Sequence, residues 1–494
     1  MATAPLTLEE RLKKLLATIH KNNPQADLDL VHLAFDYAEK AHRGQARKSG
    51  DPYIVHPLAA AQRLAEMNME TNIIVATLLH DVPEDAGVPI AEIEKHFGAD
   101  VASMVAGITK LGKLKYRGIE RYIENLRKMF VAMAEDARVI LIKFADRIHN
   151  LQTLGALPPK KQYRIALESL EIFAPIANRL GMHEIKGMLE DYSFKYVYPK
   201  EYKRIKSMVQ ERVKIQEEYF THIAEKTRLA LREAGIEPLE TEWRRKHLYS
   251  LYRKMLRKDN DMDKVYDLVA MRIVVNEIAD CYAVLGVIHK LWKPLKGRIK
   301  DYIAQQKPNG YQSLHTTVFC DGGQIVEFQI RTRAMHEEAE YGIAAHWHYD
   351  EHGSRIPDKQ LRWIKELAKV QQEMMKKVRD IEFLKIDYFK NRIFVFTPKG
   401  DVIDLPEDAT PVDFAYAIHT DLGNTCTGAT VNDQMVSLDT PLKNGDVVEI
   451  INDKNRKGPS ADWLKFAKTT HARTQIRSHT RSTIKDWLKS VIPH

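Results

Sequence analysis

Apolar residues recur every three or four positions through most of the first 190 residues, with glycine and proline between the segments. This spacing is typical of helices that bury one face. It predicts helices at residues 28–41, 57–66, 72–80 and 137–151. The first 23 residues follow the same pattern and lack the compact apolar stretch of a signal peptide. The N-terminal part is therefore expected to be an all-α domain.

The pattern changes after residue 200. Residues 201–234 are highly charged and predict one long connecting helix that ends at Gly235. Residues 269–275 and 324–331 read as strands, and helical segments lie between them, so the second domain is expected to be α/β. A second charge-rich helical connector is predicted at residues 358–379.

A third, smaller domain is indicated after this connector. Two predicted strands, residues 392–396 and 401–405, flank the turn Thr397-Pro-Lys-Gly400. Thr410-Pro-Val-Asp413 has the order of a helix start, and short strands are predicted around residues 432–433 and 445–451. These elements predict a ubiquitin-like module, followed by a basic helix. The expected domains are residues 1–195, 196–385, 386–452 and 453–494.

Composition and charge narrow the possible classes of protein. A chain of 494 residues is too long for one core and suggests about three domains, and no run of 18 apolar residues predicts a transmembrane helix. The three cysteines lie far apart, so the chain offers neither a disulfide framework nor a Cys-x-x-Cys zinc site, and a reducing cytoplasm is expected. Residues 242–315 hold 15 Lys and Arg against 8 Asp and Glu. Such a stretch attracts phosphates, although charge alone also fits a solvated basic face.

A first group of candidate chemical residues lies in the helical domain. His80-Asp81 ends an apolar helix before Pro83, His56 stands at a helix start, and Asp146 lies on another predicted helix. Two imidazoles and two carboxylates suit an ion such as Mn²⁺, which would acidify a bound water. Glu84 and Asp85 follow one turn later and could orient that water, and Asn150 shares a helix face with Asp146. A single histidine of this kind is more often a packed or surface residue, so only the combination indicates a site.

Three sequence strings place this group in a known family. Arg47-Lys-Ser-Gly-Asp-Pro-Tyr-Ile-Val-His56, His80-Asp-Val-Pro-Glu-Asp85 and Phe144-Ala-Asp-Arg-Ile-His-Asn150 resemble the hydrolase domain of RelA/SpoT homologues, within the HD superfamily. The resemblance implies removal of the 3′ pyrophosphate from (p)ppGpp with Mn²⁺. It implies metal ligation by His56, His80, Asp81 and Asp146, and catalytic help from Glu84 and Asp85. It implies nucleotide binding by Arg47, Lys48, Ser49, Tyr53 and Asn150.

A second group lies in the α/β domain. Lys246, Ser250, Arg253 and Lys254 would share one face if residues 244–254 form one helix, which would suit a triphosphate. Asp267 stands just before one predicted strand, and Glu327 alternates with apolar residues on the next. Two carboxylates beside a basic cleft are what Mg²⁺-dependent transfer from ATP requires. Pro308-Asn-Gly310 would present Tyr311 for base stacking, although an ordinary turn with a surface tyrosine fits this string as well.

This second group resembles the pyrophosphokinase domain of the same family, which has a nucleotidyltransferase-like (polymerase-β-like) fold. The implied reaction moves pyrophosphate from ATP to the 3′-hydroxyl of GDP or GTP. By this resemblance Asp267 and Glu327 hold Mg²⁺, and Glu327 is also a candidate base. Phosphate and nucleotide contacts are implied for Arg244, Lys246, Lys254, Arg298, Lys300, Lys307, Asn309, Tyr311, His315 and Gln329. Arg298-x-Lys300-Asp301 is similar to the basic version of this string in bifunctional members.

The third domain resembles the TGS module, a β-grasp domain, of these enzymes. In relatives the segment that ends at His419 meets deacylated tRNA on the ribosome, but a capping or surface histidine fits this position equally well. Long members continue into further modules, so a truncated chain or a natural short form is expected. The chain is thus expected to be a bifunctional (p)ppGpp enzyme. A hydrolase whose second domain only senses nucleotides, and a non-catalytic ribosome- or tRNA-binding regulator, are the alternatives.

Overall fold

The computed structural model describes residues 6–112, 132, 135–256, 269–307, 310–342, 345, 392–398, 402–443, 446–453, 456 and 458–491. The chain divides into two compact units, Met1–Glu373 and Met374–His494. The predicted connector at residues 358–379 lies outside the described residues. Among the described helices, none is long and apolar enough to cross a membrane.

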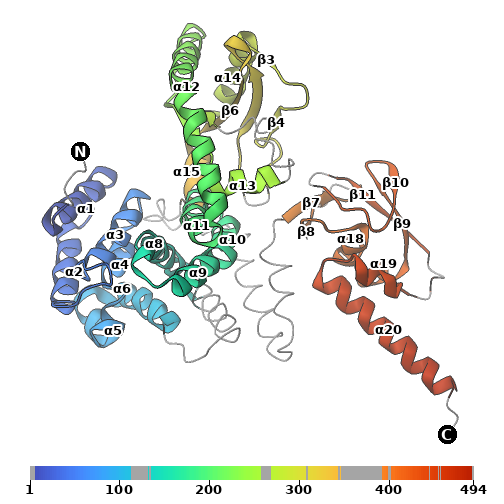
Figure 1. Cartoon of the computed structure of the whole chain (residues 1–494), viewed down its shortest axis with the longest axis horizontal. Helices are drawn as coiled ribbons and strands as arrows, with labels where there is room; N and C mark the ends of the chain where they lie inside the picture. Colours follow the sequence, from blue (N-terminus) through green and yellow to red (C-terminus); the bar gives the residue numbers. More distant parts are fainter. Residues whose placement is uncertain are drawn as a thin grey trace. The chain divides into compact units, whose positions relative to one another are not determined.

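The first unit begins with a purely helical part, shown from blue to green in Figure 1. Its helices are α1 Leu8–Asn22, α2 Leu28–Ala41, α3 Val55–Glu66, α4 Thr71–Leu79, α5 Val82–Asp85, α6 Ile90–Gly112, α8 Arg138–Gln152, α9 Pro159–Glu168, α10 Ala174–Arg179, α11 His183–Val197 and α12 Pro199–Glu233. The 3₁₀ turn η1, Leu154–Ala156, and the π-helical segment η2, Ser169–Phe173, lie among them. The helices predicted from the apolar spacing are confirmed to within two residues. Helix α4 packs against α2, α3, α6 and α8, and it is buried from Ile73 to Leu79.

The helical part gives way to a six-stranded mixed sheet with the order β1-β2-β6-β5-β3, in which β4 also pairs with β5. The strands are β1 Glu240–Arg245, β2 Val269–Val275, β3 Lys293–Pro294, β4 Lys300–Asp301, β5 Leu314–Phe319 and β6 Ile325–Thr332. The predicted α/β domain and both of its predicted strands are confirmed. Strands β2 and β6 run parallel, with Ala270 opposite Glu327.

Helices α13 Leu248–Leu256, α14 Ile278–Leu291 and α15 Arg333–Tyr341 accompany this sheet. One face of the sheet packs its apolar residues, such as Phe328 and Ile330, against α12 and α14, and Figure 1 shows these two helices beside the strands. The opposite face carries Glu327 and Gln329, which alternate with the buried residues of β6. The alternation read from the sequence is therefore confirmed.

One prediction for this domain is wrong. Residues 244–254 do not form one helix, because Arg244 and Arg245 belong to the edge strand β1, where they pair with Ala270 and Val269. Lys246 lies between this strand and α13. Pairing with the neighbouring strand satisfies the backbone groups of these two arginines, which local helix propensity could not anticipate.

The second unit holds the hairpin of β7 Arg392–Phe396 and β8 Val402–Pro406, and the sheet of β9 Cys426–Val431, β10 Gln434–Val436 and β11 Val448–Asn452. Helices α18 Pro411–Ile418 and α19 Thr420–Thr425 follow the hairpin, and α20 Thr470–Val491 follows the 3₁₀ turn η7 Ala461–Lys465. The predicted hairpin and the predicted capping box of Thr410 with Asp413 are confirmed. Trp463 and Ile476 share a core with Tyr416 of α18, so residues beyond 452 complete this module.

Candidate active sites

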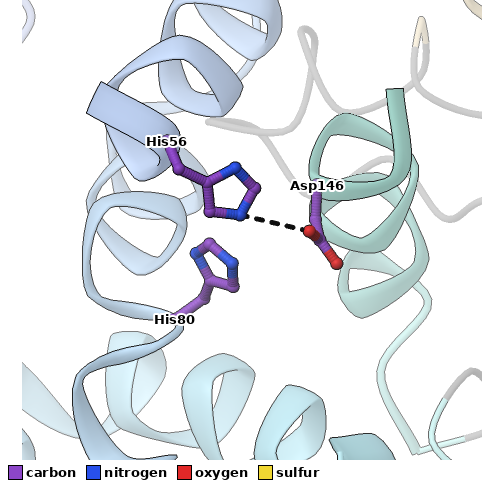
Figure 2. A group of neighbouring side chains, drawn as sticks. All are labelled: His56, His80 and Asp146. Carbon is purple, nitrogen blue, oxygen red and sulfur yellow. Dashed lines mark ion pairs between the residues drawn. The ribbon is translucent and has the colours of Figure 1, made fainter. Parts of the chain in front are cut away.

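Three helices of the first unit bring His56, His80 and Asp146 together (Figure 2). His56 is the second residue of α3, His80 caps the C-terminus of α4, and Asp146 lies in the middle of α8. One potential ligand atom from each lies within 4.8 Å of those of the other two, and all three side chains are buried. Nε2 of His56 lies 3.2 Å from Oδ1 of Asp146. Residues 24 to 90 positions apart in the sequence thus converge on one point.

The unsatisfied nitrogen of His80 supports metal binding at this point. Its Nδ1 lies 2.7 Å from the carbonyl oxygen of Thr77, so Nδ1 donates and Nε2 keeps its lone pair. That Nε2 is buried and makes no hydrogen bond. Asp81 approaches it, with Oδ1 at 3.1 Å, and Asp81 Oδ2 lies 3.6 Å from His56 Nε2. The four predicted ligands are therefore neighbours, and a buried lone pair beside two carboxylates fits a divalent cation.

The charges of the cluster also suit a cation. Burial lowers the pKa of His56, so that its imidazole is neutral. Burial alone would raise the pKa of Asp146, but the positive charge of Lys143 holds it well below its ordinary value. The pKa of Asp81 is likewise held below its ordinary value against the effect of burial. Two anionic carboxylates and the neutral imidazole of His56 are in the protonation states that metal ligands require.

Tyr53 links a ligand to a proposed catalytic carboxylate. Its hydroxyl lies 2.9 Å from Oδ2 of Asp81 and 2.5 Å from Oδ2 of Asp85. Burial and these two carboxylates raise the pKa of Tyr53, so the phenol keeps its proton. Asp85 and Glu84 are both exposed on α5, at the edge of the cluster. This position is open to water and next to the ligands, as a proton-transfer group requires.

Arg47 and Asn150 join the cluster from the other side. Nη2 of Arg47 donates to Oδ1 of Asn150 at 2.8 Å, and Nδ2 of Asn150 in turn donates to Oδ1 of Asp146. The guanidinium of Arg47 lies 5.6 Å from the ring of Tyr53. Lys48 and Ser49 are exposed in the turn between Arg47 and α3, where the hydroxyl of Ser49 donates to Asp51.

Two residues of α8 were missed by the sequence reasoning. Lys143 forms a 2.6 Å ion pair with Oδ2 of Asp146, and Nδ1 of His149 lies 2.8 Å from Nδ1 of His56. Both lie three positions from Asp146, one on each side. Helical spacing could therefore have identified them, because such positions share a face.

The second candidate site is built on β5 and β6. Oε1 of Glu327 accepts from Nδ1 of His315 and Nε2 of Gln329, each at 3.1 Å. Nε2 of His315 lies 2.8 Å from the hydroxyl of Tyr311. Four of the predicted residues therefore form one connected group. Asp267 and Asn309 lie outside the described residues.

Lysines border this group. Nζ of Lys307 lies 4.3 Å from the ring centre of Tyr302 and 4.6 Å from that of Tyr311. Burial, with Lys300 nearby, lowers the pKa of Lys307 to about 8. Lys300 stands opposite His315 on β4, whereas Arg298 is exposed in the loop before it. Lys246 and Lys254 are half-buried around α13.

Arg244, predicted to contact phosphate, takes part in a charged cluster. One oxygen, Oε1 of Glu340 on α15, lies 3.1 Å from Arg244, 2.9 Å from Arg272 and 3.3 Å from Arg331. Arg331 of β6 is fully buried beside this carboxylate. Glu340 and Arg272 were missed, because their partners are far away in the sequence.

The start of α11 contacts two predicted residues of the second site, Arg244 and Tyr311. Oε2 of Glu184 lies 3.3 Å from Nη2 of Arg244, and the ring of His183 meets that of Tyr311 edge to face at 5.5 Å. Further along α11, Asp191 accepts from the backbone amide of Tyr249 at 2.9 Å. Helix α11 also packs on α8, which holds Asp146. One helix therefore contacts elements of both candidate sites.

His419 lies in the second unit as the residue between α18 and α19. It accepts at Nδ1 from the backbone amide of Asp421 at 3.2 Å and so caps α19. Its side chain is 70% exposed. The capping interpretation of this histidine is confirmed, and its exposure leaves the ring accessible.

The chain matches three family descriptions in the predicted order. Residues 34–183 match the HD domain, residues 243–354 the region found in RelA/SpoT proteins, and residues 393–452 the TGS domain. These matches confirm the predicted fold classes. Asp81 and Glu327 fall within the first and the second match.

Curated relatives are similar to this chain over nearly all of its length. A guanosine-3′,5′-bis(diphosphate) 3′-pyrophosphohydrolase of Aquifex aeolicus is 46% identical over 96% of this chain and 67% of its own. A GTP pyrophosphokinase of Myxococcus xanthus is 46% identical over 93% of this chain and 61% of its own. The bifunctional (p)ppGpp synthase/hydrolase SpoT of Escherichia coli is 45% identical over 97% of this chain and 68% of its own. The chain thus spans about two thirds of the length of these relatives, and it belongs to the RelA/SpoT family of (p)ppGpp synthetases and hydrolases.

Proposed function

We propose that this chain both synthesises and hydrolyses (p)ppGpp, with hydrolysis assigned to residues 1–195 and synthesis to residues 196–385. The observation that carries the first activity is the convergence of His56, His80 and Asp146, with a buried Nε2 on His80 that makes no hydrogen bond. The second is supported by the connected group around Glu327. Relatives named for each activity, and one named for both, are 45–46% identical to the chain.

For hydrolysis, His56, His80, Asp81 and Asp146 would hold Mn²⁺, which would make a water more acidic when bound. Asp85 is assigned as the group that takes up a proton from water, and Tyr53 lies between it and Asp81 and keeps both carboxylates in place. Arg47 approaches the nucleotide with its planar guanidinium, while Asn150 holds Asp146. Glu84, Lys48 and Ser49 border the same side and are assigned to water and phosphate contacts.

For synthesis, Glu327 together with Asp267 would hold Mg²⁺, which offsets the charge on the transferred phosphates. Glu327 also accepts the proton of the attacking 3′-hydroxyl, oriented for this by His315. Tyr311 and Asn309 are assigned to the guanine nucleotide. Phosphate contacts are assigned to Arg244, Lys246, Lys254, Arg298, Lys300, Lys307 and His315, with Gln329 beside Glu327.

The family membership also supports proposals for the partners and the location of this chain. We assign the exposed His419, within the TGS module at residues 386–452, to contact with deacylated tRNA on the ribosome. The described cysteines, Cys281, Cys320 and Cys426, are all free and buried, which supports a reducing, cytoplasmic environment. The contacts of α11 with Arg244 and Tyr311 support exchange between two domain arrangements that favour opposite activities.

Anion-exchange analysis of nucleotides tests both activities. The protein is incubated with GDP, ATP, Mg²⁺ and Mn²⁺, or with ppGpp and Mn²⁺ alone, as wild type, Asp81→Ala and Glu327→Gln. Wild type should degrade ppGpp, Asp81→Ala should accumulate it, and Glu327→Gln should degrade but not make it. If wild type degrades ppGpp with Mn²⁺ but Asp81→Ala makes none, the chain would be a hydrolase with a nucleotide-sensing second domain. Retention of both activities by the variants would refute the assigned roles of Asp81 and Glu327. No activity in wild type would favour a ribosome- or tRNA-binding regulator.

A further inference from the structure

The two imidazoles of the candidate metal site are held in different ways. His80 donates from Nδ1 to a backbone carbonyl at 2.7 Å, which is the usual partner of a ligand histidine and fixes its tautomer. His56 has another imidazole in the corresponding place: its Nδ1 lies 2.8 Å from Nδ1 of His149. One of these two nitrogens must carry the proton. Their distance alone does not say which.

Arg47 decides the direction of this hydrogen bond. Its Nη1 lies 3.3 Å from the same Nδ1 of His149. A guanidinium has only donors, so Nδ1 of His149 must present its lone pair. Nδ1 of His56 therefore carries the proton and donates. The lone pair of His56 then lies on Nε2, which is the atom that faces Asp146 and Asp81.

We propose that His149 is a positioning residue of the hydrolase site, which fixes the metal-binding tautomer of His56 and links it to Arg47. This inference rests on the proposed hydrolase function and assigns no contact between His149 and the metal. His149 stands one helical turn after Asp146 on α8, with its ring centre 4.9 Å from that of His56. The helix that supplies one ligand thus also orients a second ligand on α3. The lone pair on Nδ1 of His149 also accepts a hydrogen bond from Arg47, which is assigned to nucleotide binding.

Two substitutions separate the acceptor from the bulk of the ring. His149→Leu fills similar space without an acceptor, so His56 is free to adopt the other tautomer. His149→Asn keeps an oxygen acceptor near the position of Nδ1. His96→Leu, at an exposed histidine on α6, is the matched control. The full chain is stripped of metal and titrated with MnCl₂ by isothermal calorimetry, without nucleotide, and the circular dichroism melting curve of each metal-free variant reports its folding.

His149→Leu should weaken Mn²⁺ binding about 10- to 100-fold, which is typical for loss of a partner of a ligand histidine. His149→Asn should recover most of this affinity, and His96→Leu should match wild type. At saturating Mn²⁺, His149→Leu should raise the KM for ppGpp more than it lowers kcat, because Arg47 has lost a contact.

Wild-type Mn²⁺ affinity in His149→Leu would overturn the inference. Equal weakening in His149→Asn and His149→Leu would also overturn it, since the ring would then act only by packing. If His149→Leu fails to fold, His149→Asn decides the question. In each of these cases wild type still binds Mn²⁺ and degrades ppGpp, whereas failure of wild type to do so would refute the proposed function itself.

Discussion

The charged side chain of His247 should stabilise the first unit, and this stability should be lost as the solution becomes alkaline. It lies just before α13, with Nδ1 at 3.0 Å from Oδ2 of Asp191 and Nε2 at 3.7 Å from Oε2 of Glu184. Its ring lies flat against α11, where a Cβ added to Gly187 would come within 2.0 Å of Nε2. Burial would lower the pKa of His247, but the two carboxylates outweigh it and raise the pKa to about 9. The charged ring thus joins the synthetase domain to a helix of the hydrolase domain.

The size and sign of the effect follow from this pKa. The ordinary value is 6.5, and each pKa unit is worth about 1.4 kcal/mol, so the paired charge stabilises the folded state by roughly 3 kcal/mol. Because the pKa is higher in the folded than in the unfolded protein, this stability is fully present below pH 6.5. It is lost as the pH rises through about 9. The histidine side chain is 24% exposed, so solvent screens only part of the interaction.

Thermal unfolding of wild type and His247→Gln from pH 6 to pH 10 measures this loss. At the acidic end the variant should melt about 4 °C lower, since a unit of 373 residues has an unfolding entropy of about 0.8 kcal/mol/K. The difference should vanish at the alkaline end. His222→Gln, at a 63% exposed histidine of α12, is the control and should stay within about 0.5 kcal/mol of wild type. A difference between wild type and His247→Gln that does not change with pH would refute the reasoning, because the ring would then act only by packing on Gly187.

Three further outcomes are expected. Glu340→Gln should lower the free energy of unfolding in urea by about 3 to 5 kcal/mol, because it leaves three guanidiniums without their shared carboxylate. Adding Arg331→Met should recover part of this loss, and no recovery would contradict the role given to Glu340. Asp413→Asn should lower the stability of the second unit by about 2 kcal/mol, because a buried carboxylate that accepts from three backbone amides cannot be replaced by an amide. The loss should be measured as faster amide hydrogen exchange of residues 463–476, and unchanged exchange would contradict this. Glu184→Gln should lower the KM for ATP in the synthesis assay, because it removes the ion pair that holds Arg244. The decrease should be no more than about fivefold, the limit for a partly exposed ion pair. A raised KM would argue that Glu184 assists Arg244.

The helices and strands were largely predictable because their signals are local. The apolar spacing in α2 and the capping box of Thr410 with Asp413 need only neighbouring residues, and both predictions are confirmed. The failure at Arg244 has the opposite cause. Whether that residue continues a helix or joins an edge strand depends on β2, about 25 positions away, which offers its backbone as a partner.

The candidate sites show the same division. His56, His80, Asp81 and Asp146 were identified by residue type and by resemblance, and the structure brings them together. Positions one helical turn from a predicted ligand, such as His149, were within reach of the same reasoning. Glu340 was not, because a glutamate that gathers arginines from three strands carries no local signature.

The contact between Glu184 and Arg244 constrains how the two activities can influence one another. If Arg244 binds a triphosphate as assigned, its guanidinium exchanges the carboxylate of Glu184 for phosphate, so ATP must loosen the start of α11. Linkage makes this reciprocal: whatever strengthens the hold of α11 on the synthetase domain weakens ATP binding by the same factor. Helix α11 packs on α8, which carries Asp146 and Asn150, so a nucleotide bound there as proposed would act on the same helix pair. Opposed regulation of the two proposed activities would then require no element beyond α8 and α11.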